Sequence, residues 1–97
     1  MITKQVIETL YKKYSKLPKS PDCLDFGLLF DSVAEHHDIT VDMDTDSLII
    51  HSLGERSPFY KLPLSRIYAI VPFEEWVAIV MHSSVIFLNH TSAKVSV

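Results

Sequence analysis

The sequence has a single cysteine, Cys23, and only two glycines, Gly27 and Gly54. One cysteine excludes an intramolecular disulfide, and with it a secreted fold stapled by disulfides. Neither glycine lies in a glycine-rich motif, so the chain has no loop of the kind that cradles phosphates. Its apolar stretches are far shorter than a membrane helix, and its first residues contain no apolar core of signal-peptide length. We therefore expect a soluble, cytoplasmic protein without a membrane span.

Positive charge is missing from the middle of the chain. Residues 20–55 contain nine acidic residues and no lysine or arginine, and the net charge of the whole chain is -3. An acidic middle opposes binding to nucleic acids and to anionic membranes. Residues 1–19 carry five lysines against Glu8, a pattern typical of a solvated helix face. We expect no nucleic-acid partner.

Helical periodicity near the N-terminus predicts a helix over about 3–16. Apolar residues recur there every three to four positions, at Val6, Leu10, Tyr14 and Leu17, with Ile7 and Tyr11 widening the stripe. Thr3 can cap the start of this helix. Pro18 ends it, so residues 17–20 are expected to form a linker.

The segment Ser20-Pro21-Asp22 favours the start of a second helix over about 21–36. It supplies a capping serine, a proline in the first turn and an acid behind it. Gly27 would lie inside this helix, where glycine costs about 1 kcal/mol relative to alanine. In an alternative interpretation, residues 24–30 form a short strand and only residues 31–37 are helical.

From residue 38 onward the pattern predicts strands. Apolar and polar residues alternate over 38–43, which is typical of a half-buried strand, and the apolar runs after Arg66 are cut by two-residue polar breaks, which is typical of hairpins. The expected strands are about 38–43, 48–53, 59–62, 66–72, 76–82, 85–90 and 93–97. Helices followed by strands predict an α+β fold. We expect a single domain, residues 1–97, with two N-terminal helices packed on one face of a five- to seven-stranded, mainly antiparallel meander sheet.

The predicted meander is apolar on both of its faces: Trp76, Ala78 and Val80 lie on one face, and Val77 and Ile79 on the other. Two helices can cover one face, and the second would remain a large exposed apolar patch, which monomers rarely tolerate. We therefore expect a protein-interaction or oligomerisation module, as a homodimer or bound to a protein partner. The interface candidates are Tyr68, Trp76, Ala78, Val80, Val85 and Phe87. In the alternative, the sheet curls enough to bury both faces on itself and the helices.

Signals for catalysis are few. No serine lies in a nucleophile elbow, and Cys23 has the acidic neighbours Asp22 and Asp25, which oppose a reactive thiolate. The aromatic residues of the strands lack the interleaved basic residues that stacking on single-stranded nucleic acid requires. We expect a protein that is not an enzyme and that carries no cofactor.

The segment from Asp42 to Asp46 is the sharpest local motif. It matches the first half of a calcium loop, with carboxylates at positions one, three and five, but Ser47 then replaces the required glycine and Leu53 the final glutamate. The five histidines of the chain include no pair at zinc-ligand spacing. The alternative function is nevertheless a small-ligand or metal-binding protein. Its candidate ligands are His51, His82, Asp42 and Asp44.

One segment resembles a known family. The run FYKLPLSRIYAIV, residues 59–71, is followed by two further short apolar strands and is similar in outline to strand segments of small bacterial pleckstrin-homology-like modules. The similar part contains no functional signature, and that family carries a C-terminal helix where the last residues here read as a strand. The resemblance implies a sheet that binds lipid or peptide. The acidic balance of the chain favours an apolar or peptide ligand over phosphoinositide head groups.

Overall fold

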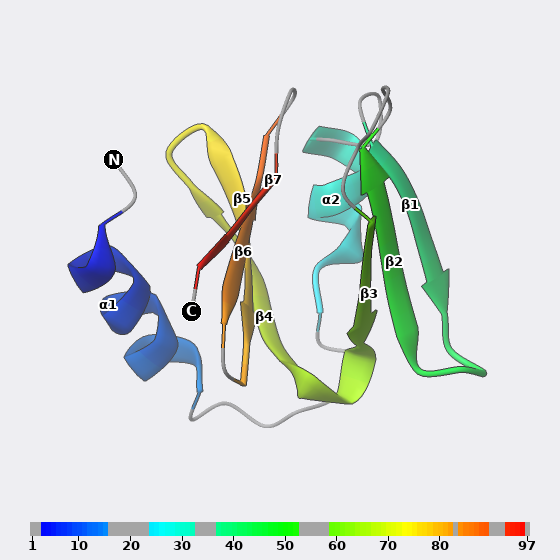
Figure 1. The fold of residues 1–97 in the computed structure, drawn as a ribbon, viewed down its shortest axis with the longest axis horizontal. Helices are drawn as coiled ribbons and strands as arrows, with labels where there is room; N and C mark the ends of the chain where they lie inside the picture. Colours follow the sequence, from blue (N-terminus) through cyan, green and yellow to red (C-terminus); the bar gives the residue numbers. More distant parts are fainter. Residues whose placement is uncertain are drawn as a thin grey trace.

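The computed structural model describes residues 3–15, 24–32, 37–52, 59–82, 84–89 and 93–96. The fold is α+β, with two helices and two antiparallel sheets (Figure 1). The helices are α1 (Lys4–Tyr14) and α2 (Phe26–Ser32). The strands are β1 (His37–Asp42), β2 (Ser47–Ser52), β3 (Phe59–Pro63), β4 (Ile67–Phe73), β5 (Trp76–Met81), β6 (Val85–Leu88) and β7 (Ala93–Ser96).

The strands form two sheets, so the prediction of one continuous sheet is wrong. One sheet has the order β1-β2-β3 and the other β4-β5-β6-β7, with every neighbouring pair antiparallel. The division falls at Pro63, which pairs with Ser47 as the last step of the β2–β3 ladder. Proline has no N–H to extend a ladder, and the chain turns there into a short 3-10 helix, η2 (Leu64–Arg66), before β4 begins.

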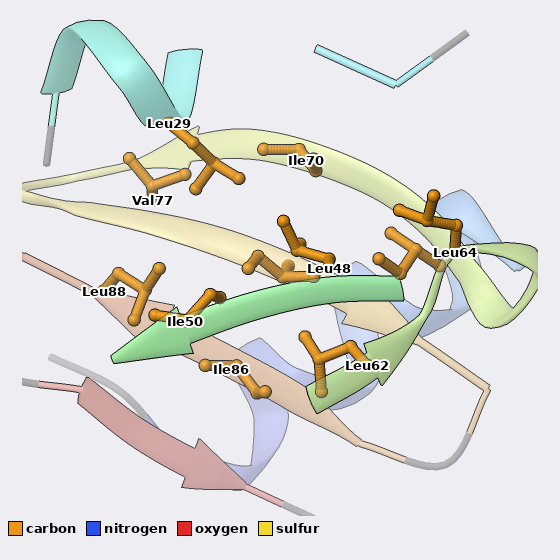
Figure 2. Close-up of a cluster of buried hydrophobic side chains, with 11 residues drawn as sticks. Leu29, Leu48, Ile50, Leu62, Leu64, Ile70, Val77, Ile86 and Leu88 are labelled. Carbon is orange, nitrogen blue, oxygen red and sulfur yellow. The ribbon is translucent and has the colours of Figure 1, made fainter. Parts of the chain in front are cut away.

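A shared core fills the space between the two sheets. Leu48 and Ile50 of β2 point from the first sheet toward Ile86 and Leu88 of β6 in the second (Figure 2). Helix α2 adds Leu29, which is fully buried against this core. The buried members are Leu29, Leu48, Ile50, Leu62, Leu64, Ile67, Ile70, Val77, Ile79, Ile86 and Leu88.

The opposite face of the β4–β7 sheet is covered by α1. Four residues of α1 pack there at helical spacing: Ile7, Leu10, Tyr11 and Tyr14. Beneath them the sheet contributes Trp76 and Phe87, whose rings meet edge to face with centroids 6.5 Å apart. The two helices therefore lie on opposite faces of this sheet, which corrects the prediction that both cover one face (Figure 1). On the inner face α2 shares the cover with the β1–β3 sheet.

The helix bounds agree with the sequence in part. Thr3 caps α1 as expected, because its hydroxyl accepts a hydrogen bond from the Val6 N–H at 3.2 Å. Helix α2 lies inside the predicted 21–36 range but begins later, where the Asp25 carboxylate accepts from the Leu28 N–H at 3.0 Å. The strand predicted over 24–30 is wrong. The linker 17–20 and both ends of the predicted second helix fall outside the described residues.

Long-range hydrogen bonds tie the first sheet to its surroundings at two places. The buried His37, at the start of β1, lies with Nε2 2.7 Å from the Asn89 carbonyl oxygen just after β6. A carbonyl only accepts, so Nε2 carries the proton. In the β1–β2 turn the Asp46 carboxylate accepts from the Ser65 hydroxyl of η2 at 2.7 Å, and the Asp46 carbonyl accepts from the Leu64 N–H at 3.0 Å. These bonds join the start of β1 to the end of β6, and the β1–β2 turn to η2.

Candidate functional site

The described part of the chain forms a groove between α1 and the turn from β5 to β6, with a volume of about 330 Å³. We call it the α1 groove. Its lining residues are Lys4, Ile7, Glu8, Tyr11, Lys12, His82, Ser84 and Val85. Ile7 and Val85 supply apolar walls, and each of the other side chains carries a polar or charged group. A cavity of this size fits a small organic molecule.

Local structure positions both walls of the α1 groove. Lys4, Glu8 and Lys12 are spaced four residues apart, so they form one line along the exposed side of the helix. On the sheet side the Met81 N–H donates to the Ser84 carbonyl at 2.9 Å, and the His82 N–H donates to the Arg66 carbonyl at 3.1 Å. These bonds fix the β5–β6 turn beside η2. The His82 and Ser84 side chains next to this turn line the groove together with residues of α1.

Two tyrosines connect α1 to His82. The rings of Tyr11 and Tyr68 meet edge to face, with centroids 6.0 Å apart. The Tyr68 hydroxyl lies 2.9 Å from Nδ1 of His82, within hydrogen-bond distance. Tyr68 is buried in the sheet, whereas His82 is exposed. The contact series Tyr11, Tyr68 and His82 therefore runs from the helix, through the sheet surface, to the rim of the groove.

The environment of Tyr11 keeps its hydroxyl protonated. Burial raises the pKa of Tyr11, and the proximity of Tyr68 and a side-chain hydrogen bond with Tyr68 raise this pKa further. A hydrogen bond that raises a phenol's pKa stabilises the protonated form, which is the form that donates.

The six residues predicted as an interface lie together, but beneath α1. Tyr68, Trp76, Ala78, Val80, Val85 and Phe87 are all at most 9% exposed and form one cluster with the helix. The alternation of faces along β5 and β6 is as predicted. The expectation that one face of the sheet is exposed is wrong, because α1 covers the outer face and the β1–β3 sheet with α2 covers the inner face. Self-association is not tested by this burial and stays a prediction.

The structure does not bring the predicted metal ligands together. His51 pairs across the ladder with Asp38, and Asp42 pairs with Ser47 at the other end of the same strands, roughly 13 Å away. His82 directly follows β5 of the other sheet. Within the ranges that the structure describes, no group of three His, Cys, Asp or Glu side chains could hold a metal ion.

The acids of the β1–β2 turn have structural partners instead. The Asp42 carboxylate accepts from the Asp44 N–H at 3.0 Å and from the Thr45 N–H at 3.3 Å, which closes the turn. Asp46 adopts a positive φ of 54° and accepts from Ser65. Short acidic side chains tolerate this conformation and bond nearby backbone, so the calcium-like spacing here is a turn signature.

Sequence reasoning missed most of the α1 groove. Lys12 was assigned to a solvated face and Tyr11 to an apolar stripe, and each assignment is half right, because the groove lies where the two faces of α1 meet. Two of the lining residues were named in advance for other roles, His82 as a metal ligand and Val85 as an interface residue. A usable signal was the line of charged residues Lys4, Glu8 and Lys12 beside the apolar stripe.

A second groove, of about 280 Å³, lies between α2 and the β4–β5 turn. Its charged lining is entirely acidic: Asp31, Glu74 and Glu75. The two grooves therefore have opposite electrostatic character, because the α1 groove carries two lysines against one glutamate.

The chain matches no protein-family model, no curated protein and no solved structure. The resemblance of residues 59–71 to pleckstrin-homology-like modules therefore gains no support from these comparisons. Among the residues that the structure describes, no helix combines the length and apolar character needed to cross a membrane.

Proposed function

We propose that this chain is a non-enzymatic, cytoplasmic oligomerisation module that self-associates by exchanging α1 between two copies. One observation carries the proposal. The six buried residues of the outer sheet face are covered by α1, yet no residue of α1 is itself buried. The sheet residues beneath α1 are therefore buried more completely than the α1 residues that pack on them.

The length of α1 supports its exchange. The helix has 11 residues, and isolated helices shorter than about 12–15 residues are marginal in water. Its helicity thus depends on docking onto an apolar face. If α1 leaves, its stripe and the sheet face are both exposed, and a second copy offers each of them the same partner.

The outer sheet face is complementary to α1, and a second copy of the chain supplies an identical α1. A second copy is therefore the partner that suits this face. Mutual exchange makes the same contacts twice and closes as a twofold dimer, so no surface is left to grow a fibre. Residues 15–25 separate α1 from α2, and eleven residues can span at most roughly 36 Å. That reach is enough to cross to a neighbouring molecule.

Light scattering after size exclusion, from micromolar to millimolar protein, tests self-association. We expect a dimer whose fraction rises with concentration. A sample refolded from equal parts ¹³C-labelled and unlabelled chain should then show intermolecular contacts between the rings of Tyr11 and Tyr68. A monomer over the whole range, or a dimer without those contacts, contradicts the proposal.

Two variants of α1 sharpen this test. Leu10→Ala truncates a side chain that packs on the sheet, and Thr9→Ala changes its exposed neighbour. The closed monomer and the exchanged dimer contain the same α1 contacts, so Leu10→Ala should leave their ratio nearly unchanged but speed their interconversion, because α1 then detaches more easily. Thr9→Ala should leave the rate of interconversion near the wild-type value. Equal rates for the two variants would mean that dimers form through another surface.

A further inference from the structure

We propose that the α1 groove binds a small organic monoanion, a carboxylate with a flat apolar body. This site differs from the helix exchange proposed above, because it lies at one edge of the docked helix. A closed monomer and an exchanged dimer would both contain it. The groove is formed whenever any copy of α1 lies on the sheet.

Charge selects an anion. Lys4 and Lys12 lie eight residues apart, roughly 12 Å along the helix, with Glu8 midway between them. Two ammonium groups against one carboxylate leave an excess of one positive charge. A singly charged ligand balances this excess, whereas a doubly charged phosphate would overcompensate it.

Hydrogen-bond direction supplies a neutral donor on the opposite wall. The Tyr68 hydroxyl lies 2.9 Å from Nδ1 of His82, and in the arrangement that we propose the hydroxyl donates to that nitrogen. An imidazole nitrogen that accepts leaves the other nitrogen as an N–H. His82 therefore presents a donor at Nε2, and the Ser84 hydroxyl lies on the same wall. A carboxylate accepts from both kinds of donor.

The apolar walls select the body of the ligand. Ile7 and Val85 face the same cavity, whose volume of about 330 Å³ exceeds that of an inorganic ion. Such a volume suits a ring bearing one carboxylate. Benzoate is the simplest probe of this kind, and a ligand of its size is expected to bind in the millimolar range.

The test is a titration of the isotope-labelled full chain followed by NMR, with benzoate and with benzyl alcohol, its uncharged counterpart. We expect benzoate to shift the resonances of Tyr11, His82 and Ser84, and benzyl alcohol to bind at least about tenfold more weakly. Shifts at the acidic groove around Glu75, equal binding of both probes, or no shifts at all would overturn the proposal. Phenyl phosphate should bind no better than benzoate, and stronger binding would contradict the monoanion assignment.

Adjacent lysines provide a matched pair of variants. Lys12 lines the groove, whereas Lys13 lies with its ammonium 5.3 Å from the ring centre of Tyr14 and does not line it. Lys12→Gln should weaken benzoate binding about three- to fivefold, and Lys13→Gln should leave it unchanged. Equal losses would show that only the general charge of the helix matters. Neither residue packs in a core cluster, so both variants should fold.

Tyr68 acts through His82 and is a positioning residue. Tyr68→Phe keeps the ring in the sheet but removes the hydroxyl that reaches Nδ1. We expect the ¹⁵N shifts of the His82 ring to change from one dominant tautomer, with the proton on Nε2, to a mixture. A purely structural role for Tyr68 would leave those shifts unchanged, and a dominant Nδ1–H tautomer in the wild type would contradict the donor assignment.

Discussion

The two faces of the β4–β7 sheet are built from alternate residues of the same strands, yet they are covered in different ways. The inner face packs against the β1–β3 sheet and α2, which contribute fully buried side chains such as Leu29, Leu48 and Ile50. The outer face packs against α1, whose packing residues are partly buried and none fully. One face is buried mutually, and the other is buried beneath a helix that stays largely in water.

Residues of equally low exposure on the two faces therefore differ in how easily they can be uncovered. Uncovering the inner face requires the two sheets to separate. The hydrogen bonds from His37 to Asn89 and from Asp46 to Ser65 must then break. Removing α1 leaves all of that in place. Local opening of this kind needs less free energy than global unfolding. Low exposure on the outer face therefore does not exclude that face from binding.

The largest expected effect comes from truncating the same residue type on each side. Leu48→Ala, at a fully buried position between the sheets, should lower the free energy of unfolding by about 2–5 kcal/mol. Leu10→Ala on α1 should cost about 1 kcal/mol, because Leu10 is only partly buried. Urea unfolding of both variants measures the contrast. If Leu48→Ala fails to fold, Ile50→Val at the same sheet should cost about 0.5–1.5 kcal/mol. Equal losses at positions 48 and 10 would erase the distinction between the faces.

A smaller effect is expected where the first sheet is tied to η2. Asp46→Ala removes the carboxylate that accepts from Ser65 and leaves a residue with a β-carbon at positive φ. We expect a loss of about 1–2 kcal/mol in urea unfolding. Asp44→Ala is the control, since Asp44 is exposed in the same turn and should change stability by less than about 0.5 kcal/mol. A similar loss in both would mean that acidity of the turn matters and the Asp46–Ser65 bond does not.

The sequence predicted elements better than it predicted their arrangement. Periodicity alone is enough to place α1 and the strands of the meander, and the alternation along β5 assigns Val77 and Trp76 to the correct opposite faces. It ended a strand at residue 62, beside Pro63, but missed that the sheet itself divides there into two. Whether a ladder continues beyond a proline depends on tertiary packing of the next turn, which no local pattern reports.

The α1 groove could be predicted even less well, for a related reason. Its two walls are separated by about seventy residues of chain, and they meet because α1 docks on the outer face of the sheet. Tyr68 shows the difficulty well. The alternation of apolar residues around Tyr68 correctly predicts a strand residue in an apolar environment. Its hydroxyl nevertheless reaches His82 at the edge of the sheet. Side-chain reach of this kind becomes visible only in three dimensions.

The smallest expected effect concerns Asp42, at the same turn. Hydrogen bonds from the Thr45 side chain and backbone, together with the Asp44 N–H and the charge of Lys61, lower the pKa of Asp42 below its ordinary value of 3.8, although burial opposes them. A carboxyl group whose pKa is lower in the folded state stabilises the fold above the unfolded pKa, and this contribution is lost as the pH falls through the folded value. Asp42→Asn keeps an acceptor without the charge. The stability difference between wild type and Asp42→Asn should therefore be constant from neutral pH to about pH 5 and shrink below about pH 4. Thermal unfolding of both proteins between pH 7 and pH 3 measures it. A difference that grows on acidification would have the wrong sign, and it would show that the charge of Asp42 opposes the turn it closes.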